Sequence, residues 1–190
     1  MDQISDDQEK IDEYLRVIHE RILTPIQTTA VRRYSTATLL LLFAAIDGVG
    51  KLLHHNSSAG SNQRILRFLD YVGGDYSTHK KELLRLRNSL VHNAINVASF
   101  LSRTETGHDL HLRKVGEDDF IHVNTVAMYE DVARAIERFH TQIQIDTAMM
   151  KRAADRLEWR ETADRLEGVD ENLSAVTPTP PPPVEFIIAK

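Results

Sequence analysis

One helical segment of the chain carries the side chains best suited to acid–base chemistry. In RNSLVH, Arg87 is followed directly by Asn88, and His92 comes one helical turn after Asn88. A histidine, with an unperturbed pKa of about 6.5, can both accept and donate a proton at neutral pH. An arginine presents a planar fork of donors that suits a phosphate group. We therefore treat Arg87, Asn88 and His92 as the candidate catalytic residues.

The periodicity of residues 80–99 is helical, and a helical projection separates the three candidates. At about 100° per residue, the predicted apolar face consists of Leu83, Leu86, Leu90, Val91 and Ala94. Arg87 falls inside this face, about 40° from Leu83, whereas Asn88 and His92 lie at about 140° and 180°. A guanidinium among leucines needs hydrogen-bond partners. Asp47, the acid within the most apolar helix, is its predicted structural partner.

The same residues also admit a purely structural interpretation. In that interpretation Arg87 and Asp47 form an internal ion pair, and His92 is an ordinary surface or interface residue. An isolated arginine and histidine at this spacing form a short pattern, so the pattern alone does not separate the two interpretations. The direction in which Arg87 points distinguishes them.

The composition is typical of a soluble protein with one domain. The chain has 190 residues, of which 42% are hydrophobic and 27% are charged. Its formal charge of −5 argues against nonspecific coating of nucleic acid, although Lys80, Lys81 and Arg85 form a local basic surface. The absence of cysteine excludes disulfides and thiolate chemistry. The acidic N-terminus is unlike a secretory signal, and the apolar run Thr38–Ile46 is shorter than the roughly 20 residues that span a bilayer.

Hydrophobic periodicity, together with glycine, proline and capping residues, predicts about five helices. They span residues 4–23, about 29–53, 64–72, 77–93 and 125–145. Gly48 and Gly50 are expected to let another helix approach the second, most apolar helix closely. Asn124 or Thr125 is the expected N-cap of the last long helix.

Residues 109–123 alternate with a period of two around a Gly-acidic turn, which predicts a β-hairpin before the last long helix. The residues expected on one face of this hairpin are Leu110, Leu112, Ile121 and Val123. His108, His111 and His122 lie on or near this hairpin, but cross-strand pairing places Arg113 opposite His122, which argues against a metal site. We predict neither a metal site nor a cofactor.

Three regions follow along the chain. Residues 1–146 are the predicted helical domain, and residues 147–168, which contain ADRLE twice, are a predicted polar helical extension. Residues 169–190 are an acidic and then proline-rich tail with the apolar tip VEFIIAK. The run TPTPPPP favours an extended polyproline II conformation.

The phrase LLRLRNSLVHN and the preceding buried helix FAAIDGVGKLL together resemble the HEPN superfamily, which has an R-polar-xxx-H motif on a helix. Here Arg87, Asn88 and His92 occupy the motif positions. The resemblance covers about residues 11–145. The hairpin, the ADRLE helix and the proline-rich tail lie outside the minimal family pattern.

The resemblance implies an all-α, HEPN-like bundle of about five helices with a small β-hairpin insertion. It also implies metal-independent cleavage of RNA by a homodimer that brings two motifs together, as in toxin–antitoxin or phage-defence systems of the cytoplasm. His92 would then move a proton to or from the RNA, Arg87 would neutralise the developing phosphate charge, and Asn88 would orient His92 or bind a phosphate oxygen. The basic residues Lys80, Lys81 and Arg85 would bind RNA. An antitoxin or a defence-system protein is an expected partner. No association with a membrane is expected.

The family also includes members that bind without cutting. The alternative function is therefore a non-catalytic helical adaptor, in which the ADRLE helix and the VEFIIAK tip hold a partner.

Overall fold

The computed structural model describes residues 3–27, 35–56, 58–93, 99–102, 109–114 and 121–157. Residues Met1–Leu157 belong to one compact unit. The described helices are α1 (Gln3–Ile18), a π-helical turn η1 (His19–Leu23), α2 (Ser35–Leu53), α3 (Ser61–Val72), α4 (Gly74–Thr78), α5 (Lys80–Asn93), α6 (Thr125–Ile145) and α7 (Thr147–Ala154). The described strands are β1 (Ser99–Ser102) and β2 (Ile121–Asn124). The predicted all-α class is confirmed.

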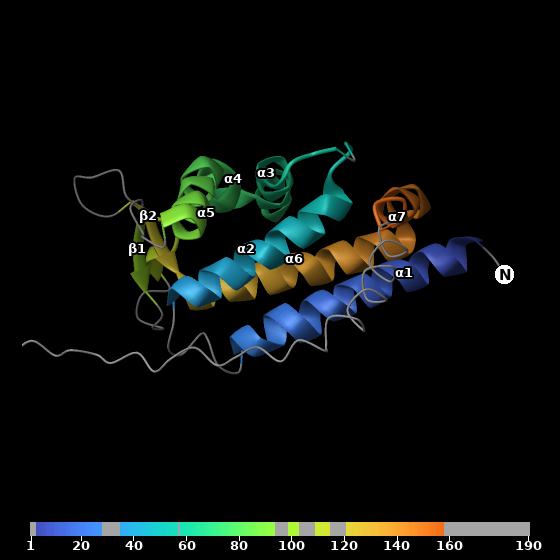
Figure 1. Ribbon diagram of the computed structural model, residues 1–190, viewed down its shortest axis with the longest axis horizontal. Helices are drawn as coiled ribbons and strands as arrows, with labels where there is room; N and C mark the ends of the chain where they lie inside the picture. Colours follow the sequence, from blue (N-terminus) through green and yellow to red (C-terminus); the bar gives the residue numbers. More distant parts are fainter. Residues whose placement is uncertain are drawn as a thin grey trace, which may run out of the picture. The chain divides into compact units, whose positions relative to one another are not determined.

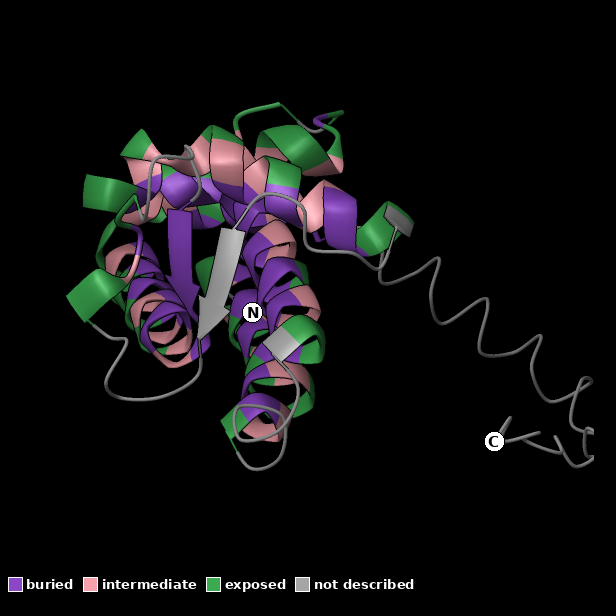
Figure 2. Ribbon diagram, turned by 90° about the vertical axis from the view of Figure 1, so that its left-hand side faces the viewer, coloured by how far each residue is buried: buried purple, intermediate pink, exposed green. Residues whose placement is uncertain are grey.

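The long helices α2 and α6 run side by side through the middle of the domain, with α1 on one side and α3, α4 and α5 on the other (Figure 1). The helices bury their apolar faces against one another, and the exposed positions point outward (Figure 2). From α2, the fully or nearly fully buried side chains are Leu39, Leu42, Phe43, Ile46 and Val49. From α6 they include Met128, Val132, Phe139 and Ile143.

Asn124 is the N-cap of α6, and it is one of the two residues that the sequence predicted for this role. Its side-chain Oδ1 accepts hydrogen bonds from the backbone N–H groups of Val126 and Ala127, both at 3.0 Å. These bonds satisfy two of the N–H groups that the first turn of a helix otherwise leaves unpaired. Asn124 is completely buried, so its cap fixes the junction between β2 and α6 inside the domain.

The two glycines of α2 mark the close helix approaches that the sequence predicts. A Cβ built on Gly50 would lie 2.3 Å from the carbonyl oxygen of Arg64 in α3. A Cβ on Gly48 would lie 3.1 Å from both Ile18 and the hydroxyl of Tyr14 in α1. Backbone atoms of α3 therefore rest directly on α2 at Gly50, where any side chain would separate the helices.

The predicted β-hairpin is confirmed in part, because Lys114 pairs antiparallel with Ile121 in the register that places Arg113 opposite His122. β2 pairs in parallel with β1, in a register that joins Ser99 to Ile121 and Ser102 to Asn124. The first half of the expected hairpin is a turn rather than a strand, because Leu112 has a left-handed backbone with φ of 59°. Residues 112–114 still meet β2, through hydrogen bonds of 2.7 Å from Leu112 N to His122 O and 2.8 Å from His122 N to Arg113 O. Residues 115–120 lie outside the described residues.

One member of the predicted hairpin face is also misplaced. Leu112, Ile121 and Val123 are buried, but Leu110 is 46% exposed. The left-handed residue at Leu112 breaks the alternation on which the common face depended.

The expected polar extension is described as far as Leu157, and over that part it is not polar throughout. Met150, Ala153, Ala154 and Leu157 are buried. α7 packs against α1, α2 and α6. The core therefore continues past the expected boundary at residue 146. The remainder of that extension and the predicted tail, residues 158–190, lie outside the described residues.

The apolar stretch of α2 is longer than the run Thr38–Ile46 indicated. An 18-residue window, Thr36–Leu53, has a mean hydropathy of 1.7, so that by length and composition this helix could cross a membrane. Within the domain, 56% of the window is buried, and a central core helix meets the same criteria.

The α2–α3 contact predicts that the stability of the fold depends on the absence of a side chain at Gly50. We expect Gly50→Ala to lower the free energy of unfolding by about 1–3 kcal/mol, because the new methyl group must displace backbone of α3. Gly60→Ala is the matched control, since a Cβ there meets nothing within 4 Å. Urea denaturation of both variants measures the difference, and equal stabilities would contradict the close contact.

Candidate functional site

α5 is rotated relative to the face expected from the sequence. Its buried residues are Leu83, Leu86, Ser89 and Leu90, whereas Val91 is 48% exposed. The centre of the buried face is thus shifted away from Arg87 and Val91. Arg87 is half-buried at the edge of the core.

The predicted ion pair between Arg87 and Asp47 is wrong. Asp47 is held instead by Arg64 of α3, whose Nε and Nη2 donate to the two carboxylate oxygens at 2.7 and 2.9 Å. Arg64 reaches Asp47 because its backbone lies over Gly50, about one helical turn after Asp47 on α2. Gly50 was expected to be a point of close helix approach, but the sequence did not indicate that α3 would supply the partner of Asp47.

Ser61, the first residue of α3, joins Arg87 to this pair. Its hydroxyl donates to Asp47 Oδ2 at 3.1 Å and accepts from Arg87 Nη2 at 3.2 Å. Arg87 Nη1 donates to Asn88 Oδ1 at 3.0 Å. We call Asp47, Ser61, Arg64, Arg87 and Asn88 the Asp47 network. It links α2, α3 and α5 and sets the position of the Arg87 guanidinium.

The surroundings of the Asp47 network are cationic. Lys51 lies one turn after Asp47 on α2 and is close enough to Arg64 to be affected by its charge, while Arg64 and Arg87 both belong to the network. Burial lowers the pKa of Lys51, and the charge of Arg64 lowers it further. Burial raises the pKa of Tyr14, the Asp47 carboxylate adds to this effect and Arg64 opposes it. The excess of positive charge favours an anionic ligand at this surface.

Arg87 retains hydrogen-bonding capacity. A guanidinium has five N–H donors. Within the described part of the chain, Arg87 uses one toward Asn88 and one toward Ser61, and it contacts no carboxylate. Its charge is therefore not neutralised by a direct partner there, and its remaining donors are available to a phosphate.

His92 lies apart from Arg87. It is exposed in the last turn of α5, and no side-chain hydrogen bond to another described residue holds it. Five residues along a helix correspond to about 140° of rotation and about 7.5 Å of rise. Asn88 and His92 share a face, as expected, but Arg87 and His92 do not converge on a common point within one chain.

The three basic residues predicted to bind RNA differ in their surroundings. Lys80 is engaged by Asp70, with its Nζ at 2.6 and 2.7 Å from the two carboxylate oxygens. Ser77 also donates to Asp70, at 2.6 Å. Lys81 and Arg85 are exposed on α5. Of the three, Lys81 and Arg85 are the residues that remain accessible to a polyanion.

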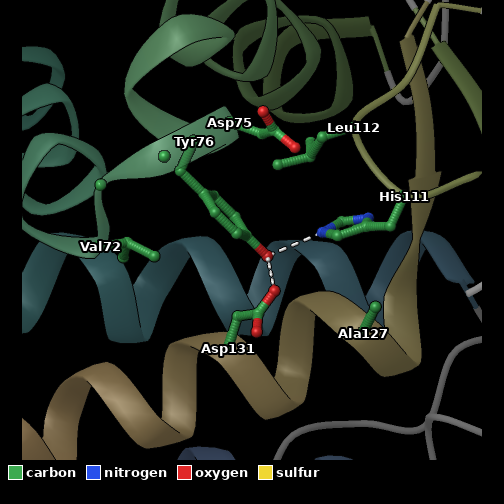
Figure 3. Close-up of a pocket in the computed structure, with 9 residues that line it drawn as sticks. Val72, Asp75, Tyr76, His111, Leu112, Ala127 and Asp131 are labelled. Atoms are coloured by element: carbon green, nitrogen blue, oxygen red, sulfur yellow. Dashed lines mark hydrogen bonds between the residues drawn. The ribbon is translucent and has the colours of Figure 1, made fainter. Parts of the chain in front are cut away.

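The structure also brings together a second cluster of polar side chains, which the sequence did not indicate. Tyr76 of α4 lies 2.8 Å from His111 Nε2 and donates to Asp131 Oδ2 of α6 at 3.0 Å (Figure 3). These residues border an open cavity of about 370 Å³. They are 20 to 55 residues apart in the chain, so no local spacing connects them.

One backbone donor fixes the direction of this hydrogen-bond chain. The N–H of Asn124 donates to His111 Nδ1 at 3.0 Å, so Nδ1 is unprotonated and the neutral ring carries its proton on Nε2. His111 Nε2–H then donates to Tyr76 Oη, and Tyr76 donates to Asp131. Arg134 also donates to Asp131.

Among the residues that the structure describes, no group of three or more His, Cys, Asp and Glu side chains is placed to hold a metal ion. Comparison of the chain with protein families, curated proteins and solved structures finds no match.

The Tyr76 environment predicts a loss of stability at alkaline pH. Burial raises the pKa of Tyr76 well above its usual value, and the adjacent Asp131 carboxylate raises it further. The folded state therefore favours the neutral phenol. This contribution is present below the unfolded pKa of about 10 and is lost as the pH rises above it. Urea denaturation between about pH 9 and pH 11 should show a shallower loss of stability for Tyr76→Phe than for the native protein. Identical slopes would contradict the assignment.

Proposed function

We propose that the protein is a metal-independent endoribonuclease in which Arg87, Asn88 and His92 act on RNA. The observation that supports this proposal most directly is the set of hydrogen-bond partners of Arg87. The Asp47 network holds its guanidinium at the edge of the domain, where no carboxylate of a described residue contacts it. An arginine neutralised by Asp47 would have favoured the structural interpretation. The observed arrangement leaves both charge and donors for a phosphate group.

The chemistry requires no metal because RNA contains its own nucleophile, the 2′-hydroxyl. In the proposed reaction, one imidazole accepts the 2′-hydroxyl proton as the oxygen attacks the adjacent phosphorus. The bond from phosphorus to the 5′-oxygen breaks, and an acid protonates the leaving oxygen. Arg87 stabilises the charge on the phosphate in the transition state. Asn88, held by Arg87 and one turn from His92, orients the histidine or a phosphate oxygen.

The complete site is proposed to form between two copies of the chain. A base and an acid must both reach one phosphate, and each chain places a single histidine, His92, in this segment. Arg87 and His92 also diverge around α5. A two-fold dimer would supply the second motif. Val91, exposed beside His92, gives this surface an apolar contact of the kind that association buries.

Electrostatics add to the case for RNA. Arg64 and Arg87 belong to one hydrogen-bonded network, and the exposed Lys81 and Arg85 lie on the same face of α5 as His92. A local basic surface of this kind can bind a phosphate backbone even though the whole chain carries a net negative charge. The HEPN-like motif further suggests a cytoplasmic toxin or phage-defence role with a protein partner.

RNA cleavage in EDTA tests the proposal. We expect the native protein to cut single-stranded RNA and the variants Arg87→Ala and His92→Ala to lose about 10²–10⁴-fold in rate. Arg152→Ala and His55→Ala remove the same residue types from exposed positions on α7 and in the α2–α3 loop. Both controls should retain the native rate, as measured on end-labelled RNA by gel electrophoresis.

Cleavage that survives both Arg87→Ala and His92→Ala would exclude these residues as the catalytic site. An absence of cleavage in the folded native protein would favour the helical adaptor instead. Circular dichroism and thermal melts of each variant distinguish a lost function from a lost fold.

The proposed dimer makes a separate prediction at Val91. Because Val91 is 48% exposed, Val91→Asp should leave the fold intact. We expect it to convert a dimer into a monomer and to reduce cleavage at least tenfold, since burial of an unpaired carboxylate in the interface is unfavourable. Ile145→Asp introduces the same charge at a residue that is 82% exposed on α6. Light scattering should show a dimer for this control, and a dimeric Val91→Asp protein would contradict the proposed interface.

A further inference from the structure

The cavity beside Tyr76 has the dimensions of a binding site for a small molecule. Its volume of about 370 Å³ lies within the range of about 300–1,000 Å³ that is typical of ligand pockets. The end of α3, the turn at Gly73 and Gly74, α4, the turn at His111 and α6 form its walls. Figure 3 shows the Tyr76 side chain extending from α4 toward α6, where His111 and Asp131 meet its hydroxyl.

The direction of the hydrogen-bond chain determines what the cavity can offer to a ligand. His111 uses Nδ1 to accept from Asn124 and Nε2–H to donate to Tyr76. Tyr76 uses its only proton toward Asp131. Among the described side chains that line the cavity, no donor is left over, whereas the Tyr76 oxygen and the Asp131 carboxylate retain acceptor lone pairs.

Asp75 adds a second carboxylate to the lining. It is exposed, and no hydrogen bond or ion pair to another described residue engages its side chain. Asp131 contributes from the facing helix α6, with Arg134 as its partner on the outer, solvent side, where the Arg134 side chain is 68% exposed. The cavity thus combines acceptor side chains with a negative charge.

The turn at Gly73 and Gly74 keeps one side of the cavity open. Both glycines have positive φ, and a Cβ on either would meet nothing within 4 Å. No side chain of the turn occupies the adjacent space. The apolar groups Val72, Leu112 and Ala127 complete the lining and can contact the carbon atoms of a ligand.

From these features we infer that the cavity binds an organic cation with several N–H donors, namely a guanidinium or a primary ammonium group. Such a group pairs with Asp75, shares the acceptor positions of Asp131 and Tyr76, and rests its carbon chain on the apolar lining. An anion would meet two carboxylates without a side-chain donor. The same cation chemistry occurs in free amines and guanidines and in the arginine side chain of a protein.

Calorimetric and NMR titration of the full-length protein with agmatine tests the inference. We expect saturable binding with shifts of the His111 ring signals. Tetramethylammonium, a cation without N–H donors, should not bind. Asp75→Asn should weaken agmatine binding about tenfold, since it removes a charge-assisted hydrogen bond from an exposed position that does not support the fold. Glu137→Gln, which removes an exposed carboxylate elsewhere on α6, should bind as the native protein does.

Equal binding of agmatine and tetramethylammonium would overturn the inference, as would equal agmatine affinity for Asp75→Asn and the native protein. A lack of agmatine binding in the folded native protein would overturn it as well. A blocked Gly-Arg-Gly peptide that binds more tightly than agmatine would support the cation site and identify a protein arginine as its source. Tighter binding of agmatine would support a free small molecule. RNA cleavage plays no part in these measurements, so their outcome is independent of the proposed nuclease activity.

Discussion

The contact between α2 and α3 at Gly50 determines how the Asp47 network is arranged. Because Gly50 has no side chain, the backbone of Arg64 lies against α2 and its guanidinium reaches Asp47. The Asp47 carboxylate accepts hydrogen bonds from Arg64 and from Ser61. Arg64, rather than Arg87, therefore neutralises its charge. The identity of the residue that pairs with Asp47 therefore follows from helix packing.

This arrangement has a consequence for the chemistry of α5. A direct ion pair with Asp47 would have neutralised Arg87 and drawn it into the core. Contact with the neutral oxygens of Ser61 and Asn88 orients the guanidinium, and no carboxylate in the described part of the chain contacts it. The proposed nuclease activity depends on this difference, because a transition state with developing negative charge needs an oriented cation near the substrate.

The Tyr76 cavity shows a second way in which packing creates a polar site. Its three central groups come from α4, from a turn and from the start of α6, and the buried N–H of Asn124 sets the tautomer of His111. Asn124 also caps α6 through its side chain. The same residue therefore fixes both the start of a helix and the direction of a hydrogen-bond chain.

The sequence by itself determined the features that depend on near neighbours in the chain. Periodicity identified the main helices, Asn124 was one of two expected caps, and Gly48 and Gly50 were expected contact points. These features follow from local backbone preferences and from which residues share a helix face. The alternation in residues 109–123 predicted the antiparallel pairing of Lys114 with Ile121, but it did not predict the turn before it. That turn contains Leu112 in a left-handed conformation, which the leucine side chain does not favour.

Only the tertiary structure decided which distant groups meet. Arg64 rather than Arg87 pairs with Asp47, β1 pairs in parallel with β2, and Tyr76 joins His111 to Asp131. Each of these pairings depends on a distance between separate elements. A difference of a few ångströms in helix packing selects one arginine over another, and a one-dimensional pattern contains no such distance.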